Sequence, residues 1–277
     1  MSIEIRKTSR RLTVRAIPAI LALCASVVPR SVNANDFGFP SSADFKMLNE
    51  DGSKVVGYSH YSLEPNGSNS YLLYEEDHFL EGQHDIEHDQ LEARGSDRPA
   101  VVITYEHDYF DAHGSPDRVA RANFRTGEAS CTVYENGRPR VSSSRLDFPL
   151  DTYSGSTVLI PLDYYLRRGS KGPISMHNFN CMPGPEILSI ETDPRYPAFW
   201  EHYPGQLLEM RLKPDFGWLN MLIAPFVPSI DAWFDPSKDW EFVGSRFYRY
   251  YQGPEIILVR IITAANHDKL RQSPDIR

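Results

Sequence analysis

Histidines and carboxylates are concentrated in one stretch of the chain, between residues 75 and 89. In sequence order they include Glu75, Glu76, Asp77, His78, His84, Asp85, Glu87, His88 and Asp89. A strand over residues 83–91 would place its two histidines on one face and its three acids on the other, because side chains alternate along a strand. His107, in the next strong strand pattern, can join either face. Imidazoles combined with carboxylates bind zinc or copper, so His84, His88 and His107 are candidate metal ligands.

The same pattern has a simpler interpretation, which is a solvated face at the edge of a sheet, where charges discourage aggregation. The chain has no compact ligand spacing such as H-E-x-x-H, which would place two imidazoles on one helix face. The surface interpretation is therefore favoured. A metal-dependent enzyme that uses the histidine cluster is kept as an alternative function.

Other kinds of catalysis have less support in the sequence. Ser154-Gly155-Ser156 does not supply the G-x-S-x-G turn of a serine hydrolase. Phosphate-binding and dinucleotide-binding motifs are also absent from the sequence. A catalytic triad is recognised by geometry, which a sequence does not show. The sequence therefore favours a protein that is not an enzyme, and it predicts neither a catalytic residue nor an organic cofactor.

A nearly uncharged segment near the C-terminus favours binding of an apolar ligand. Residues 216–227 read FGWLNMLIAPFV, and Trp218, Leu222 and Phe226 are its candidate ligand contacts. A curved sheet covered by a short apolar segment can enclose a cavity of lipid size. The alternative is that the segment closes the end of the core. Arg246 and Arg260 interrupt the apolar rows of the last two strand patterns, and either one facing a concavity would hold a ligand headgroup.

Strand patterns dominate the elements that must position these residues. They recur between residues 54 and 148, at 174–181, 187–192 and 207–213, and in a final pair within 228–263. Residues 151–168 predict a short helix that Pro161 restricts to one or two turns. Residues 193–205, rich in proline, read as a loop. The predicted fold is mainly β: one large curved antiparallel sheet, forming a half-barrel or open barrel, with one or two short helices. The final strand pair is predicted to lie at its edge or seam.

The first 34 residues predict a secretory signal peptide. Five basic residues precede a short apolar run from Ala16 to Val28, and Val32-Asn33-Ala34 forms a small-residue cleavage site. Alternatives are a membrane anchor, twin-arginine export at Ser9-Arg10-Arg11, and a lipoprotein anchored at Cys24. We therefore expect a periplasmic or secreted protein with one β-rich domain over residues 35–277.

Cysteine content and charge agree with export. Removal of the leader leaves two cysteines, Cys131 and Cys181, which are predicted to form one disulfide; two buried thiols are the alternative. The mature chain carries a net charge of −13, since the leader removes six basic residues and one acid. Such an acidic protein is a poor partner for nucleic acids. No later segment has the apolar length of a transmembrane helix, so the protein is not expected to be integral to the membrane.

The order of these patterns resembles a known group of proteins. A strand meander is followed by DTYSGSTVLIPLDYYLRRG at residues 151–169, by further strands, and by DAWFDP at residues 231–236. This order resembles uncharacterised exported bacterial β-rich proteins related to the LolA-like half-barrels. The resemblance implies a curved sheet around short helices, with a concave face that binds acyl chains. The predicted function is thus a non-enzymatic envelope protein that binds an apolar ligand, such as a lipid, or an envelope partner. A structural or interaction module is the other possibility.

Overall fold

The computed structural model describes residues 42–95, 98–170, 172–181, 184–215, 229–250 and 253–261. Within these ranges no helix is both long enough and apolar enough to cross a membrane. The predicted signal peptide and its cleavage site lie outside the described residues, as do Cys24, Trp218, Leu222 and Phe226.

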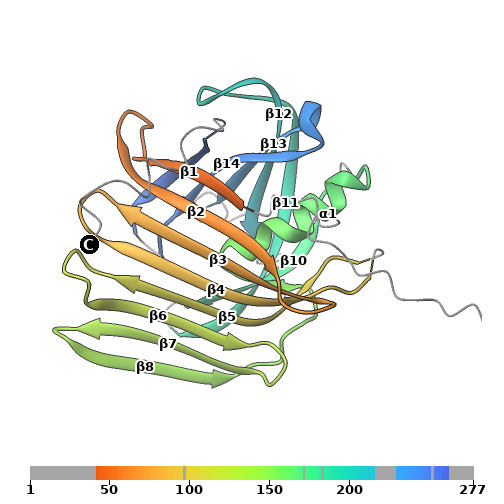
Figure 1. The fold of residues 1–277 in the computed structure, drawn as a ribbon. Coiled ribbons are helices and arrows are strands. Elements are labelled where there is room, and N and C mark those ends of the chain that lie inside the picture. The colour runs from red at the N-terminus through yellow and green to blue at the C-terminus, as the bar shows by residue number, and fades with distance from the viewer. Residues whose placement is uncertain are drawn as a thin grey trace, which may run out of the picture. The chain divides into compact units, whose positions relative to one another are not determined.

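Fifteen strands within the described residues form one open sheet, which confirms the predicted mainly β fold. The first eight are β1 (Ser42–Leu48), β2 (Val55–Pro65), β3 (Ser70–Phe79), β4 (His84–Glu92), β5 (Val101–Phe110), β6 (Pro116–Asn123), β7 (Glu128–Glu135) and β8 (Arg138–Arg145). The others are β9 (Thr152–Tyr153), β10 (Ser175–Cys181), β11 (Pro185–Trp200), β12 (Tyr203–Pro214), β13 (Ile230–Asp235), β14 (Glu241–Tyr248) and β15 (Glu255–Arg260). Neighbouring strands pair antiparallel except β9 and β10, which run parallel. Figure 1 shows β2 to β8 side by side as one broad layer.

The predicted hairpin at the end of the chain forms, but it does not lie at an edge of the sheet. β14 pairs with β15, and β15 pairs on its other side with β1, Phe45 opposite Arg260. The strand order is β8-β7-β6-β5-β4-β3-β2-β1-β15-β14-β13-β12-β11-β10-β9, so the hairpin is central. The prediction of an edge was wrong because β15 finds its second neighbour at the start of the chain. It is a seam between the two halves of the sheet.

A disulfide joins the two ends of this strand order. Cys131 on β7 is bonded to Cys181 on β10, with Cα atoms 5.7 Å apart, as the sequence predicted. Each of these strands is the second from an edge of the sheet. The covalent bond therefore holds the two edges of the open sheet close to each other, which hydrogen bonds between the strands do not do.

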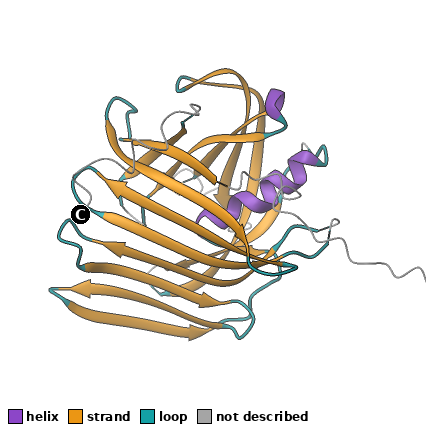
Figure 2. Ribbon diagram, viewed as in Figure 1, coloured by secondary structure: helices purple, strands orange, loops and turns teal. Residues whose placement is uncertain are grey.

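One short helix fills the space between the two halves. The 3-10 turn η2 (Gly155–Val158) leads directly into α1 (Leu159–Arg167), and Figure 2 shows how little of the chain is helical. Pro161 lies in the first turn of α1, where its missing N–H is not required. Leu162 and Leu166 are fully buried and pack in one core with Leu73 of β3 and Met210 of β12. The inner side of the sheet is thus packed with side chains.

β11 is longer than the sequence predicted. It runs to Trp200 through the proline-rich stretch that reads as a loop. The register with β12 shifts between Arg195 and Ala198, and the irregular pairing accommodates prolines, which lack the N–H that a regular ladder requires. The hairpin of β11 and β12 carries Trp200, which stacks on Trp233 with ring centroids 4.3 Å apart. This stack anchors a second, smaller core.

Candidate functional site

The acids of β4 face the interior of the protein. Asp85, Glu87 and Asp89 are only 3%, 2% and 2% exposed, whereas His88 on the same strand is exposed. The predicted alternation of faces is therefore correct. The interpretation of this stretch as a solvated sheet edge is wrong, because β4 lies between β3 and β5 and its acids point toward the core.

Strand register assembles these acids with polar residues of the neighbouring strands. On the inner face Glu75 of β3 lies opposite Glu87, and Glu87 lies opposite His107 of β5. A second row on the same face, two residues away along each strand, consists of Asp77, Asp85 and Tyr109. A third row, two residues away in the opposite direction, consists of Leu73, Asp89 and Tyr105. Polar groups thus occupy a continuous patch of the inner face, named here the inner polar cluster.

The loop before α1 docks onto this cluster. The backbone N–H of Ser156 donates to Oε1 of Glu87 at 2.9 Å, and the Ser156 hydroxyl donates to Glu75. The Glu75 carboxylate also accepts a hydrogen bond from Ser59 at 3.1 Å. Gly155 has a φ of +49°, and a Cβ at this position would overlap the Glu87 carboxylate. The two glutamates therefore accept hydrogen bonds at the start of the helical segment, where unpaired N–H groups and the helix dipole favour negative charge.

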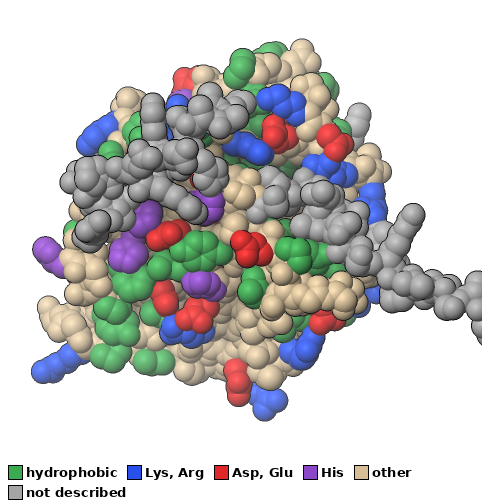
Figure 3. Space-filling view, in the orientation of Figure 1, with side chains coloured by type: hydrophobic (Ala, Val, Ile, Leu, Met, Phe, Trp, Pro, Cys, Tyr) green, Lys and Arg blue, Asp and Glu red, His purple; other side chains and the backbone are tan. Residues whose placement is uncertain are grey.

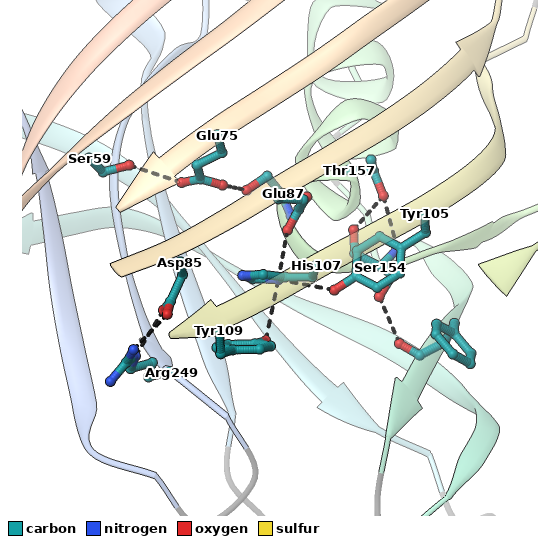
Figure 4. Close-up of polar contacts among 12 residues, drawn as sticks. Ser59, Glu75, Asp85, Glu87, Tyr105, His107, Tyr109, Ser154, Thr157 and Arg249 are labelled. Carbon is teal, nitrogen blue, oxygen red and sulfur yellow. Dashed lines mark hydrogen bonds and ion pairs between the residues drawn. The ribbon is translucent and has the colours of Figure 1, made fainter. Parts of the chain in front are cut away.

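His107 lies at the centre of the cluster (Figure 4). Its Nδ1 is 3.2 Å from Oε2 of Glu87, 3.2 Å from the Tyr105 hydroxyl and 3.3 Å from the Tyr109 hydroxyl. Its ring stacks on Tyr109, with centroids 4.1 Å apart. Burial alone would lower the pKa of His107, but the hydrogen bond and the charge of Glu87 outweigh burial and raise that pKa. The imidazole therefore favours the charged form, which balances Glu87.

Asp85 is paired with an arginine from the far end of the chain. Arg249 follows β14 and forms two hydrogen bonds with Asp85, Nε to Oδ2 at 2.8 Å and Nη2 to Oδ1 at 2.6 Å (Figure 4). The side chains of Arg249 and Asp85 are 12% and 3% exposed. The guanidinium also lies over the Phe79 ring, 4.3 Å from its centroid. Bidentate pairing of this kind fixes both the position and the orientation of the carboxylate.

The other acids of the cluster hold their protons more tightly than usual. Burial, and then the charges of Asp77 and Glu87, raise the pKa of Glu75 well above its ordinary value. Burial and the charge of Asp85 raise the pKa of Asp77 to about 7. Burial and the charge of Glu87 raise the pKa of Asp89, which lies within hydrogen-bonding reach of the Glu87 side chain and the Glu106 backbone. Burial in the cluster thus favours the protonated form of these three acids.

The three histidines predicted as metal ligands do not come together. His84 and His88 lie on the outer face of β4, and His107 lies on the inner face of β5. The His84 ring stacks on the Phe110 ring with centroids 4.3 Å apart, and the His88 ring packs against the Tyr74 ring with centroids 4.9 Å apart. No group of three or more potential metal ligands is arranged to hold an ion in the part of the chain that the structure describes. The predicted metal site was wrong because its members occupy opposite faces of the sheet.

A large hollow lies on the outer face of β2 to β8. It has a volume of about 1070 Å³ and is open along its length. Two cross-strand rows form its floor, and both follow from the register. One row is Glu64, Leu72, Gln90, Thr104, Asn123, Glu128 and Arg145. The other is Ser62, Tyr74, His88, Glu106, Arg121, Ser130 and Ser143. We name this surface the outer groove.

The lining of the outer groove combines hydrogen-bonding groups with flat rings. Carboxylate, guanidinium and hydroxyl groups come from both rows, and side-chain amides come from the first row only. The rings of Tyr74 and His88 pack together in the second row. Arg121 is held by Glu106 at 2.5 Å. Figure 3 shows acidic, basic, histidine and hydrophobic side chains interspersed over this layer. The groove crosses the seven strands β2 to β8, and the six spacings between them, each about 4.8 Å, give it a length of about 29 Å.

The two arginines predicted to bind a headgroup already have carboxylate partners. Arg246 lies opposite Ile257, a residue of the second core, and its Nε is 3.0 Å from Glu255. Arg260 shares the strand phase of Leu258 in the main core, and its Nη1 is 3.1 Å from Glu241. Arg249, which the sequence gave no reason to prefer, is the arginine of this hairpin that reaches the inner polar cluster. Its position just before the turn is the only sequence signal that sets it apart.

Comparisons with known proteins add one likeness. A search of solved structures finds the crystal structure of a beta-barrel-like protein of domain of unknown function DUF1849 from Brucella abortus. The match covers 79% of this chain and 94% of that chain, at 10% sequence identity and a TM-score of 0.43. It does not confirm the resemblance to LolA-like half-barrels. No protein-family model and no curated protein matches the chain.

Proposed function

We propose that the protein is an exported, non-enzymatic binding protein that holds an oligosaccharide chain in the outer groove. The observation that carries the proposal is the pair of cross-strand rows along the floor of the groove. Sugar rings present hydroxyl groups at regular intervals and also an apolar face. Amide, carboxylate and guanidinium groups form paired hydrogen bonds with neighbouring hydroxyls, and aromatic rings pack against the apolar face.

The charges of the groove support a neutral ligand. Three glutamates and two arginines contribute to the two rows, so neither sign dominates. A polyanion such as nucleic acid would require a basic surface. A lipid would require a mainly apolar enclosed pocket, whereas this groove carries charged and hydrogen-bonding side chains in both rows of its floor. The length of about 29 Å suits an extended chain better than a small molecule.

Export is supported by the disulfide and by the predicted leader. Disulfides persist in oxidising compartments, and the Cys131–Cys181 bond joins strands from the two ends of the sheet. The predicted apolar ligand depends on Trp218, Leu222 and Phe226, and it stays a prediction, as does an envelope protein partner. The oligosaccharide proposal depends on none of these residues.

The test is binding of the purified mature chain to oligosaccharides of increasing length and to purified peptidoglycan, by calorimetry and co-sedimentation. Affinity should rise with chain length until the ligand fills the groove. Gln90→Ala removes one hydrogen-bonding side chain from the floor and should weaken binding about five- to tenfold. Gln83→Ala, just before the same strand and outside the groove, is the matched control and should bind normally.

Tyr74→Ala and Tyr58→Ala form a second matched pair, because the two tyrosines lie on neighbouring strands and only Tyr74 lines the groove. We expect loss of binding with Tyr74→Ala alone. Equal weakening by both changes, or no length dependence, would contradict the proposal. Binding of peptide stems but not of glycan chains would show that the groove is a peptide site instead.

A further inference from the structure

We propose that a small pocket beside His107 binds an oxyanion, that is, the carboxylate or phosphate group of a small molecule. The pocket has a volume of about 80 Å³. It lies between the inner face of β5 to β7 and the facing strand β10, with the loop before α1 on one side. Its polar lining comes from Tyr105, Tyr109, Arg118, Ser154 and Asn180, with Tyr250 at its side. Only Tyr105 borders both hollows, whereas Tyr109, Arg118 and Asn180 line this pocket and not the outer groove, so the inference does not rest on the proposed function.

Hydrogen-bond donors exceed acceptors around this pocket. Nδ1 of His107 is close to three oxygens, those of Glu87, Tyr105 and Tyr109, but one nitrogen forms only one ordinary hydrogen bond in a given protonation state. When Nδ1–H donates to Glu87, both phenol hydrogens must find other acceptors. Tyr105 has the Ser154 hydroxyl within hydrogen-bonding reach, and that hydroxyl donates its own hydrogen to the Phe179 carbonyl at 2.9 Å.

Among the described residues, the Tyr109 hydroxyl has no second hydrogen-bond partner. This hydroxyl contacts Nδ1 of His107 and lines the pocket, so when Glu87 takes the imidazole hydrogen, the hydroxyl hydrogen of Tyr109 is left for a ligand in the pocket. Asn180 adds two further donors. Its Oδ1 accepts the backbone N–H of Cys181 at 2.7 Å, and its amide nitrogen has no partner among the described residues. A group that accepts several hydrogen bonds at once is therefore the complementary ligand.

Arg118 supplies the positive charge. It lies directly opposite Tyr109 on the neighbouring strand, and its guanidinium is 4.2 Å from the centroid of the Tyr250 ring. Its Nε is buried without a hydrogen-bond partner among the described residues. Asp117, at 3.4 Å, is its carboxylate neighbour, and the Asp117 side chain is 41% exposed. Water therefore screens this pair, and much of the positive charge of Arg118 remains available to the pocket.

The acids of the inner polar cluster do not forbid an anion at this position. Asp85 is neutralised by Arg249, and Glu87 is matched by His107. Burial raises the pKa of Glu75 and of Asp89, so both favour the uncharged form. Arg118 is the charged side chain that lines the pocket itself. Without a ligand, the volume holds about two or three water molecules, which is the simplest other occupant.

The experiment titrates inorganic phosphate and, in a separate arm, acetate into the full mature chain, in a buffer without other oxyanions. Calorimetry and the thermal midpoint report binding, since a ligand that binds the folded state raises the midpoint. We expect one site per chain with one of the two anions, and the better binder distinguishes a phosphate from a carboxylate site. Tyr109→Phe and Arg118→Met should each weaken binding about tenfold or more.

Arg125→Met is the matched control, because Arg125 follows the same strand, is exposed and lines neither hollow. It should leave anion affinity unchanged. Tyr109→Phe keeps the ring that stacks on His107, so the variant should still fold. The shift of the thermal midpoint with added anion is also measured on the unmodified protein and depends on no variant. Absence of any shift up to high anion concentration, or equal weakening by Arg118→Met and Arg125→Met, would overturn the proposal and leave water as the occupant.

Discussion

The backbone N–H of Ser156 donates a hydrogen bond of 2.9 Å to Glu87, which is 69 residues away in the sequence. This contact connects the first turn of the helical segment to the centre of the sheet. It also explains the burial of Glu87, which provides an acceptor that the start of a helix requires. Because the sheet carries the binding surfaces and the helix fills its interior, the stability of this contact affects both.

Gly155→Ala should destabilise the protein by about 2–4 kcal/mol, because the residue has a positive φ and a Cβ there would overlap the Glu87 carboxylate. Urea unfolding measures the change. Gly172→Ala is the control, since nothing lies within 4 Å of a Cβ at that position, and it should change stability by less than about 0.5 kcal/mol. Equal effects of the two substitutions would show that the Gly155 loop is not tightly docked.

The buried pair of Asp85 and Arg249 yields a second prediction. Arg249→Met leaves a buried carboxylate without its partner and should cost about 3–5 kcal/mol. The double variant Asp85→Asn, Arg249→Met should recover much of that loss, because neither charge remains. Arg125→Met, which breaks the exposed pair with Glu92, should cost less than about 1 kcal/mol. A double-mutant cycle from urea unfolding measures the coupling, and additive effects would argue against the pair.

The sequence predicted the strands and the faces of β4 because alternation is a local property. It did not predict which face is buried, since both faces of β4 carry polar residues and the partners of the acids are distant. Asp85 meets Arg249 across 164 residues, and Glu87 meets Ser156 across 69. The central position of the final hairpin depends on β1, at the other end of the chain. The outer groove likewise requires the register of seven strands, which no single segment encodes.

Stability should depend on pH through Asp77. Burial, followed by the charge of Asp85, raises its folded pKa from 3.8 to about 7. The folded state therefore holds a proton that the unfolded state releases between these values, so this contribution is complete below about pH 4 and is lost as pH rises through 7. Asp77→Asn should flatten the fall in unfolding free energy between pH 4 and 7. Asp51→Asn tests the opposite pH dependence of stability. Hydrogen bonds from Ser53 lower the pKa of Asp51, so the contribution of Asp51 to stability is lost as pH falls. An unchanged pH profile in Asp77→Asn would contradict this assignment.

Removal of the disulfide should open the sheet at its two edges. Cys131 and Cys181 enclose a loop with a sequence separation of 50, so Cys131→Ala, Cys181→Ala should lower the free energy of unfolding by about 2–5 kcal/mol. Amide hydrogen exchange should increase most in β7, β8 and β10, because the bond joins strands from opposite ends of the strand order. The seam of β1 and β15 should stay protected, since hydrogen bonds on both sides hold those strands. Uniform acceleration over the whole sheet would show instead that the bond stabilises the fold globally and does not specifically hold the edges together.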